Sequence, residues 1–209
     1  MKIKDAIQNN PLCRHHETCD DLHRVVITSE QIRQTIQVLT RQIQGAYAKH
    51  TSVVILFLLK GAKQFAGDLE DSLGEGKFEF VPAQASSYRG STHSTGEVEI
   101  NSHDMPDITG QSVLILDDMY DSGLTLKRVK AHLEIKGAAD AKTCVMFEKK
   151  CPHTHEVAPD FVGLPVPNEF LVGYGLDYQE QYRELRCVGT LKPDIIASKF
   201  HHENIQSVS

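Results

Sequence analysis

Short apolar runs alternate along this chain with segments of helical periodicity, and this alternation restricts the fold more than any other feature. The run from Ser52 to Leu59 is apolar on both faces, as expected of a central strand in a parallel sheet. Further strands are predicted at 25–27, 78–83, 113–116, 143–147 and 170–173. Parallel neighbours need crossover connections, usually helices, so the sequence predicts an α/β fold with a mainly parallel sheet flanked by helices.

Three helices are predicted between these strands. Thr28 and Gln31 form a capping box before the first helix, whose apolar stripe is Ile32, Ile36, Leu39 and Ile43. Gly61 is expected to open a second helix patterned by Phe65, Leu69 and Leu73. A third, after Gly123, carries Leu126, Val129 and Leu133. Residues 86–97 are rich in Ser, Thr and Gly and predict a long loop of the kind that is often functional.

Composition bounds the class of protein. With 209 residues and 40% hydrophobic content, the chain predicts a single domain over 1–209, with its core at about 20–193 and loosely held polar tails. The net charge of −6 argues against a nucleic-acid-binding protein. No apolar run approaches the length of about 20 residues that spans a bilayer, so no membrane partner is expected. Five cysteines without a CxxC pair indicate a reducing, cytoplasmic location.

The segment from Val113 to Thr125 carries the clearest chemistry, because an apolar strand ends in carboxylates and a small polar turn then starts a helix. Ligands of open α/β sheets bind at that edge. The turn from Asp121 to Thr125 would offer backbone N–H groups, two hydroxyls and a helix N-terminus, which suit a phosphate. Asp117 and Asp118 suit sugar hydroxyls or hydrated Mg²⁺. The pattern predicts a site for a phosphorylated sugar.

Other interpretations of single motifs stay open at this level. An Asp-rich turn after a strand can be an ordinary solvated helix N-terminus, and Lys149 can be a solvated strand end. Phe170, in an apolar run, would by default be a core residue. The GxxxxGK[ST], GxGxxG and GxSxG patterns are absent. Cys13, His15, His16 and Cys19, and Cys151, His153 and His155, lack standard zinc spacing.

The same residues resemble the signature of the type I phosphoribosyltransferases, which is two acidic residues after an apolar strand, then Asp-Ser/Thr-Gly and a Thr. Asp117-Asp118, Asp121-Ser122-Gly123 and Thr125 match it. Further short motifs resemble the hypoxanthine-guanine branch of this family in particular. They are Leu58-Leu59-Lys60-Gly61, Ser87-Tyr88, Ser94-Thr95-Gly96, 159–163 and 172–178. The resemblance runs from about residue 20 to Pro193 and implies the family's parallel sheet with a small hood lobe built from the chain ends.

The resemblance implies transfer of a phosphoribosyl group from phosphoribosyl pyrophosphate to a 6-oxopurine, giving a nucleoside 5′-monophosphate and pyrophosphate, with Mg²⁺ required. Asp121 would be the acid/base group at purine N7. Asp121, Ser122, Gly123, Leu124 and Thr125 would hold the 5′-phosphate, and Asp117 and Asp118 would meet the ribose hydroxyls. Lys60 and Gly61 would offer N–H groups to pyrophosphate, after a cis peptide bond between Leu59 and Lys60, and Arg183 would also reach pyrophosphate.

For the base, the resemblance implies that Lys149 donates to the purine O6, that Phe170 stacks on the ring, and that backbone at Leu171 and Asp177 reads the ring edge. Asp177, with Asp117 and Asp118, is the expected metal-ligand set. Ser87 and Tyr88 would belong to a lid loop. Relatives are commonly dimers or tetramers, so a homodimer or homotetramer is expected.

The chain departs from the family pattern at three positions: Leu124 stands where many relatives carry Lys, Asp117 where Glu is common, and Leu171 where Val is frequent. Two rival functions remain. One is a regulator of the same fold that senses phosphoribosyl pyrophosphate and binds nucleic acid, which would need a basic face. The other is the same chemistry on xanthine or adenine. Adenine fits less well, because its exocyclic amine wants an acceptor where Lys149 offers a donor.

Overall fold

The computed structural model describes residues 20–87, 98–101, 106–151 and 158–197. Its internal contacts divide the chain into two compact units, one of Met1–Arg33 with Glu169–Ser209 and one of Gln34–Asn168. The elements in chain order are β1 (Leu22–Ile27), α2 (Ser29–Ala46), β2 (Val53–Leu58), α3 (Lys63–Leu73), β3 (Phe78–Ser87), β4 (Val98–Asn101), β5 (Ser112–Tyr120), α4 (Leu124–Ile135), β6 (Asp140–Lys149), β7 (Phe161–Val166) and β8 (Val188–Leu191).

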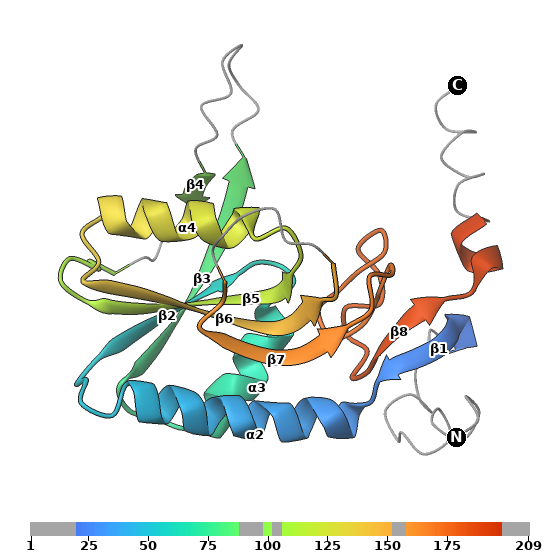
Figure 1. The fold of residues 1–209 in the computed structure, drawn as a ribbon, viewed down its shortest axis with the longest axis horizontal. Helices are drawn as coiled ribbons and strands as arrows, with labels where there is room; N and C mark the ends of the chain where they lie inside the picture. Colours follow the sequence, from blue (N-terminus) through green and yellow to red (C-terminus); the bar gives the residue numbers. More distant parts are fainter. Residues whose placement is uncertain (1–19, 88–97, 102–105, 152–157, 198–209) are drawn as a thin grey trace, which may run out of the picture. The chain divides into compact units, whose positions relative to one another are not determined.

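The larger unit is built on a six-stranded sheet of order β4-β3-β2-β5-β6-β7 (Figure 1). The strands β3, β2, β5, β6 and β7 are parallel, and β4 pairs antiparallel with β3 at one edge. The chain is therefore an α/β protein with a mainly parallel sheet, as the alternation predicts. Pro165 lies in β7, an edge strand, where a missing N–H costs least.

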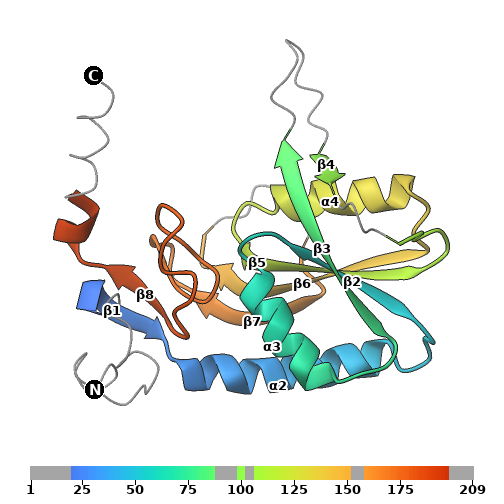
Figure 2. The same cartoon turned by 180° about the vertical axis from the view of Figure 1, so that it is seen from behind.

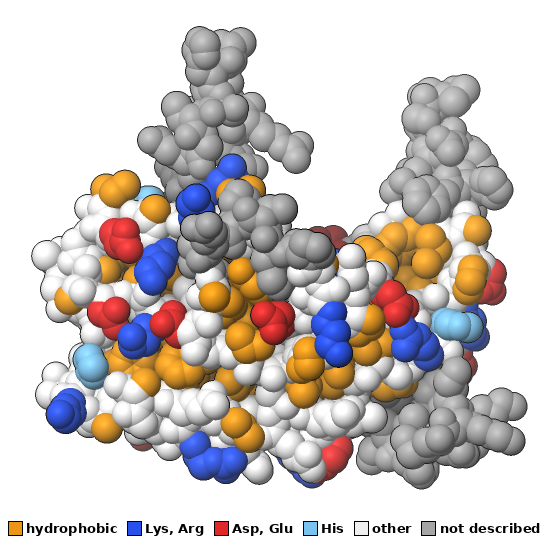
Figure 3. Space-filling model, in the orientation of Figure 1, with side chains coloured by type: hydrophobic (Ala, Val, Ile, Leu, Met, Phe, Trp, Pro, Cys, Tyr) orange, Lys and Arg blue, Asp and Glu red, His pale blue; other side chains and the backbone are white. Residues whose placement is uncertain are grey.

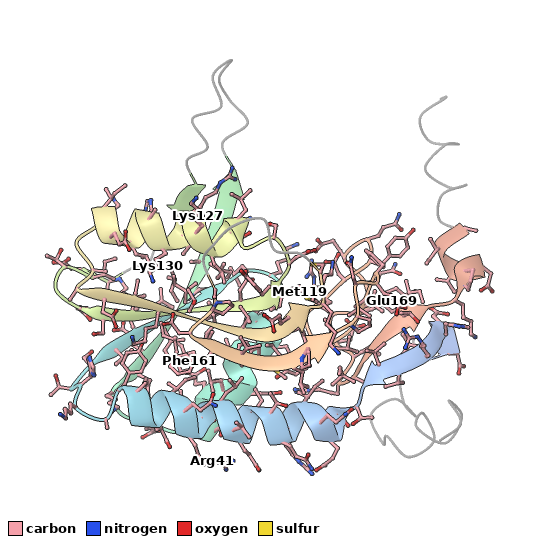
Figure 4. The ribbon with its side chains drawn as sticks, viewed as in Figure 1. Arg41, Met119, Lys127, Lys130, Phe161 and Glu169 are labelled. Atoms are coloured by element: carbon pink, nitrogen blue, oxygen red, sulfur yellow. The ribbon has the colours of Figure 1, made fainter. Side chains whose placement is uncertain are left out.

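Helices cover both faces of this sheet: α4 lies on one, and α3 with the 34–46 part of α2 on the other (Figures 1 and 2). Leu126, Val129 and Leu133 of α4 pack in one buried cluster with residues of the central strands. On the other face, Figure 4 shows Phe161 of β7 lying towards α2, while Arg41 points away from the sheet. A Cβ on Gly163 would lie 3.0 Å from Thr35 Cγ2, so this strand approaches α2 closely.

The first helix begins as its sequence predicts. The backbone N–H of Gln31 donates to Thr28 Oγ1 at 3.2 Å, and the N–H of Thr28 donates to Gln31 Oε1 at 2.9 Å. This reciprocal pair is the predicted capping box. All four residues of the predicted stripe are buried: Ile32, Ile36, Leu39 and Ile43.

The smaller unit joins the two ends of the described chain. Strand β1 pairs antiparallel with β8 in a two-stranded sheet. One buried cluster unites Leu22 from the first part with Val172, Tyr182, Leu185, Cys187 and Leu191 from the second. The Tyr182 hydroxyl donates to Asp21 at 2.8 Å. This unit is built from segments near the two ends of the chain, as expected of the hood lobe.

The structure corrects several predicted elements. Residues 170–173 are not a strand: Val172 makes only an isolated bridge to Gly189, and the positive φ angles of Gly173 (102°) and Tyr174 (51°) turn the chain. Ser86 and Ser87, expected in the 86–97 loop, belong to β3, and 88–97 lie outside the described residues. Gly61 precedes rather than opens α3, and β4, β7 and β8 were not predicted. The residues before 20 and after 197 lie outside those described.

No helix in the described ranges is long and apolar enough to cross a bilayer.

Candidate active site

Three neighbouring parallel strands deliver the predicted residues of the larger unit to one edge of the sheet. Strand β2 ends at Leu58, just before Lys60 and Gly61, while β5 and β6 pair as far as Tyr120 and Glu148. Because β2, β5 and β6 are adjacent and parallel, their carboxyl ends meet at the same edge. This is the edge at which open α/β sheets bind ligands.

The loop after β2 and the acidic end of β5 are in close contact. The peptide bond between Leu59 and Lys60 is cis, as the resemblance implies. A Cβ on Gly61 would lie 2.1 Å from Asp118 Oδ2 and 2.4 Å from Asp118 Cγ. Any larger residue here would require the Asp118 carboxylate or the loop to shift, so the structure places Gly61, next to Lys60, directly against Asp118.

Asp117 is a buried carboxyl beside a second carboxyl. It is 8% exposed, and its Oδ1 accepts a hydrogen bond from the backbone N–H of Asp118 at 3.0 Å. Burial, and then the charge of Asp118, raises the pKa of Asp117 well above its usual value. Ionised Asp117 therefore needs hydrogen-bond donors or a cation, and ribose hydroxyls or Mg²⁺ can supply these.

The turn between β5 and α4 presents polar groups to solvent. Asp121, Ser122 and Thr125 are exposed, and Gly123 caps the helix in the left-handed conformation, with φ 79°, that glycine adopts without steric cost. Helix α4 begins at Leu124, whose N–H donates to Ser122 Oγ at 3.3 Å. The first N–H groups of a helix lack partners within it, and the helix dipole favours an anion there. The described geometry suits a phosphate group.

The structure brings together two predicted residues that follow or end different strands: Asp121 comes directly after β5, and Lys149 is the last residue of β6. Lys149 Nζ, at the end of β6, is 2.7 Å from Asp121 Oδ2. The two side chains are 21% and 54% exposed, so the carboxylate is open to a ligand while the lysine stem is largely covered. A cation and a carboxylate thus stand side by side at the sheet edge.

Cys151 also reaches this pair, and no role was predicted for it. Its Sγ lies 3.6 Å from Asp121 Oδ1. A single cysteine after a strand end carries no signal in one sequence, because the contact depends on how β5 and β6 are aligned. The structure describes no other member of the two Cys/His groups considered for zinc, 13–19 and 151–155.

The remaining predicted purine and pyrophosphate residues belong to the smaller unit. Phe170 is 56% exposed, so it is not a core residue, and its ring meets Tyr178 edge to face at 5.6 Å. Leu171 is buried. Asp177 Oδ1 lies 2.8 Å from an Arg183 guanidinium nitrogen, and Asp177 Oδ2 accepts from the N–H of Glu180.

Of the predicted lid residues, Ser87 is the last residue of β3, where it pairs with Val98. Tyr88 and most of the predicted loop, 88–97, lie outside the described residues.

Comparisons with known proteins show the family to which this chain belongs. The family described as phosphoribosyl transferase domain matches residues 27–179. The hypoxanthine-guanine phosphoribosyltransferase of Mycobacterium tuberculosis is 37% identical over 84% of this chain and 89% of its own length. A crystal structure of a hypoxanthine phosphoribosyltransferase from Staphylococcus aureus superposes with a TM-score of 0.77 at 32% identity, covering 87% of this chain and 97% of that one.

The chain is also 35% identical, over 84% of its length, to the bifunctional protein TilS/HprT of Listeria monocytogenes, of which it spans 27%. The match to the family covers most of the chain, and the signature residues stand at the carboxyl edge of the sheet. The chain belongs to the phosphoribosyl transferase family, in its hypoxanthine-guanine branch.

Proposed function

We propose that this chain transfers the 5-phosphoribosyl group from phosphoribosyl pyrophosphate to hypoxanthine, with guanine as a second substrate, in purine salvage. The observation that carries the proposal is the 2.7 Å pair of Lys149 and Asp121 beside a phosphate-binding turn. A 6-oxopurine has the acceptor O6 and the N7 position next to each other on one edge. A lysine donor and a carboxylate side by side complement that edge.

The phosphoribosyl group occupies the turn and the strand end. The N–H groups and hydroxyls from Asp121 to Thr125, including Ser122, Gly123 and Leu124, hold the 5′-phosphate. The carboxylates of Asp117 and Asp118 accept hydrogen bonds from the ribose hydroxyls. Backbone N–H groups at Lys60 and Gly61, with the Arg183 guanidinium, hold the pyrophosphate. Leu124 brings no charge where many relatives carry Lys, so this cradle depends on backbone N–H groups and hydroxyls.

Reaction forms the bond from purine N9 to ribose C1′ and breaks the bond from C1′ to pyrophosphate. The N7 proton passes to the Asp121 carboxylate, and Lys149 donates to O6 as that atom gains electron density. Phe170 stacks on the ring, which its 56% exposure supports. The backbone at Leu171 and Asp177 pairs with the rest of the ring edge.

Magnesium is proposed as the cofactor. In the described ranges no group of three or more His, Cys, Asp or Glu side chains is arranged to hold a metal by itself. Protein Mg²⁺ sites often use one or two carboxylates with substrate oxygens, and Asp117, Asp118 and Asp177 are such donors. The raised pKa of buried Asp117 also fits a site that a cation completes. When bound, Mg²⁺ would neutralise charge on the leaving pyrophosphate.

One face of the described residues does not offer the basic surface that the regulatory alternative needs. On the face drawn in Figure 3, acidic and basic side chains are interspersed rather than gathered into a basic field. A nucleic-acid-binding face would be strongly positive. A sensor of phosphoribosyl pyrophosphate also has no need for an exposed stacking ring and a donor for O6.

Two further properties remain proposals. A reducing, cytoplasmic setting is proposed from the sequence pattern of five cysteines without a CxxC pair. A homodimer or homotetramer is proposed from the family resemblance alone.

The function is tested by supplying the purified chain with phosphoribosyl pyrophosphate, Mg²⁺ and each of hypoxanthine, guanine, xanthine and adenine, and measuring pyrophosphate release. Hypoxanthine should be consumed fastest and adenine least. Asp121→Asn should lower kcat by roughly 10²- to 10⁴-fold if the carboxylate moves the proton. Absence of turnover with every 6-oxopurine would refute the enzyme assignment, and an unchanged kcat would remove Asp121 from that role.

A further inference from the structure

Asp121 is held by two different donors, one on each oxygen. Lys149 Nζ lies 2.7 Å from Oδ2, and Cys151 Sγ lies 3.6 Å from Oδ1 and 4.0 Å from the Asp121 carbonyl oxygen. Sulfur is larger than oxygen, so the separation from Oδ1 is within reach of a thiol hydrogen bond. The lysine has a predicted partner in the purine O6, but the thiol has no role in the reaction as described above.

Backbone bonds fix the thiol in this place. The N–H of Cys151 donates to the carbonyl of Lys149 at 2.9 Å, which closes a tight turn at the end of β6. The N–H of Lys150 donates to the Val166 carbonyl of β7 at 2.9 Å and ties the same turn to the sheet. Asp121, by contrast, is 54% exposed at the start of a turn. A side chain so exposed changes rotamer readily unless hydrogen bonds hold it.

The protonation state of the thiol suits a donor. Burial, and next the hydrogen bond with Asp121, raises the pKa of Cys151 above its usual value, against an opposing effect of Lys149. The group therefore stays S–H at neutral pH, where a thiolate would repel the carboxylate.

We propose that Cys151 is a positioning residue for Asp121, whose thiol holds Oδ1 so that Oδ2 faces the purine N7 when Lys149 turns to O6. This inference rests on the proposed function, in which Asp121 takes the N7 proton. A hydrogen bond to a carboxylate stabilises its charged form. A thiol donor on Oδ1 thus also favours the charged carboxylate, the form that a proton acceptor requires.

The test compares Cys151→Val, which keeps a similar volume without a donor, with Cys151→Ser, which keeps a donor, and with Lys150→Ala as a matched control. Lys150 is the exposed neighbour. Cys151→Val should lower kcat by about 2- to 10-fold, the effect of one hydrogen bond. The acidic limb of its kcat profile should move to higher pH, with the KM for phosphoribosyl pyrophosphate unchanged. Cys151→Ser should recover most of both effects, and Lys150→Ala should match the wild type.

A Cys151→Val enzyme with wild-type kcat and pH profile would overturn the inference. So would a Cys151→Ser variant as impaired as Cys151→Val, because that result would assign the thiol to packing alone. The double variant Asp121→Asn/Cys151→Val distinguishes the positioning role of Cys151 from the proposed function. If Asp121 takes the N7 proton and Cys151 works through Asp121, adding Cys151→Val to Asp121→Asn should lower kcat no further. If Asp121→Asn alone keeps full kcat, the role of Asp121 fails, whatever Cys151→Val does.

Discussion

The backbone at Gly61 lies so close to Asp118 that a Cβ there would be 2.1 Å from the carboxylate oxygen Oδ2. Gly61 follows β2 and Asp118 lies near the end of β5, so this contact joins the loop proposed for pyrophosphate to the strand end proposed for ribose. The groups proposed to hold the two halves of one substrate therefore lie side by side.

Gly61→Ala should therefore impair the enzyme. The added methyl group must displace Asp118 or the loop, and misplacement of this size lowers kcat/KM for phosphoribosyl pyrophosphate by about 10- to 100-fold. Steady-state kinetics would measure this, and urea unfolding should show a loss of about 1–3 kcal/mol. Gly67→Ala is the matched control, because Gly67 lies inside α3 with no atom within 4 Å of a Cβ. It should leave activity intact and stabilise by about 0.5–1 kcal/mol. Full activity in Gly61→Ala would show that the close contact does not matter.

Asp117 should make stability depend on pH. Its pKa is raised in the folded chain, first by burial and then by the charge of Asp118, so the folded state keeps a proton that the unfolded state has released. From the unfolded pKa of about 3.9 up to the raised folded pKa, stability therefore falls as pH rises. Asp117→Asn removes this titration, so the variant should be more stable than the wild type above that range and should lose less stability on going from about pH 5 to pH 8.

Urea unfolding at the two pH values checks this prediction. Asp107→Asn is the control, because hydrogen bonds from Thr109 lower the pKa of exposed Asp107 and place its titration below the measured range. Equal pH dependence in Asp117→Asn and the wild type would contradict the raised pKa.

Lys149→Ala should weaken purine use more than sugar use. Loss of a charged donor to O6 lowers kcat/KM for hypoxanthine by about 10- to 100-fold. The KM for phosphoribosyl pyrophosphate should change little. Lys150→Ala, at the exposed neighbouring lysine, is the matched control and should have the kinetics of the wild type. Equal losses for both substrates in Lys149→Ala would mean that the lysine serves Asp121 or the fold rather than the base.

Much of the fold and part of the site could be predicted from local patterns. The alternation of strands and helices, the Thr28 capping box and the order of Asp117, Asp118 and Asp121 all depend on neighbouring residues. Strand β7 was missed, because Gly163 and Pro165 interrupt its apolar pattern. The strand predicted at 170–173 was wrong, because an apolar run alone does not distinguish a buried strand from a buried turn.

Contacts between residues far apart in the sequence could not be predicted from such local patterns. Lys149 and Asp121 are 28 residues apart, and they meet only because β5 and β6 pair in a particular register. The contact of Cys151 with Asp121 has the same origin, and the contact of Gly61 with Asp118 depends on the pairing of β2 with β5. A resemblance could suggest roles for several of these residues, but the spacing between them comes from the sheet.

Phe170→Ala should raise the KM for hypoxanthine by about 10- to 100-fold, the range for loss of one base–aromatic stack. Its effect on stability should be small, because Phe170 is 56% exposed. Ile135, which is 85% exposed on α4, gives the matched substitution Ile135→Ala, and its kinetics should equal those of the wild type. An unchanged hypoxanthine KM in Phe170→Ala would leave the ring without a role in base binding.

The most direct measurement is a crystal structure of the chain with inosine 5′-monophosphate and Mg²⁺. The account predicts the 5′-phosphate against the N–H groups from Ser122 to Thr125, the ribose hydroxyls at Asp117 and Asp118, and N7 beside Asp121. A nucleotide bound elsewhere, with the turn between β5 and α4 free of phosphate, would contradict it.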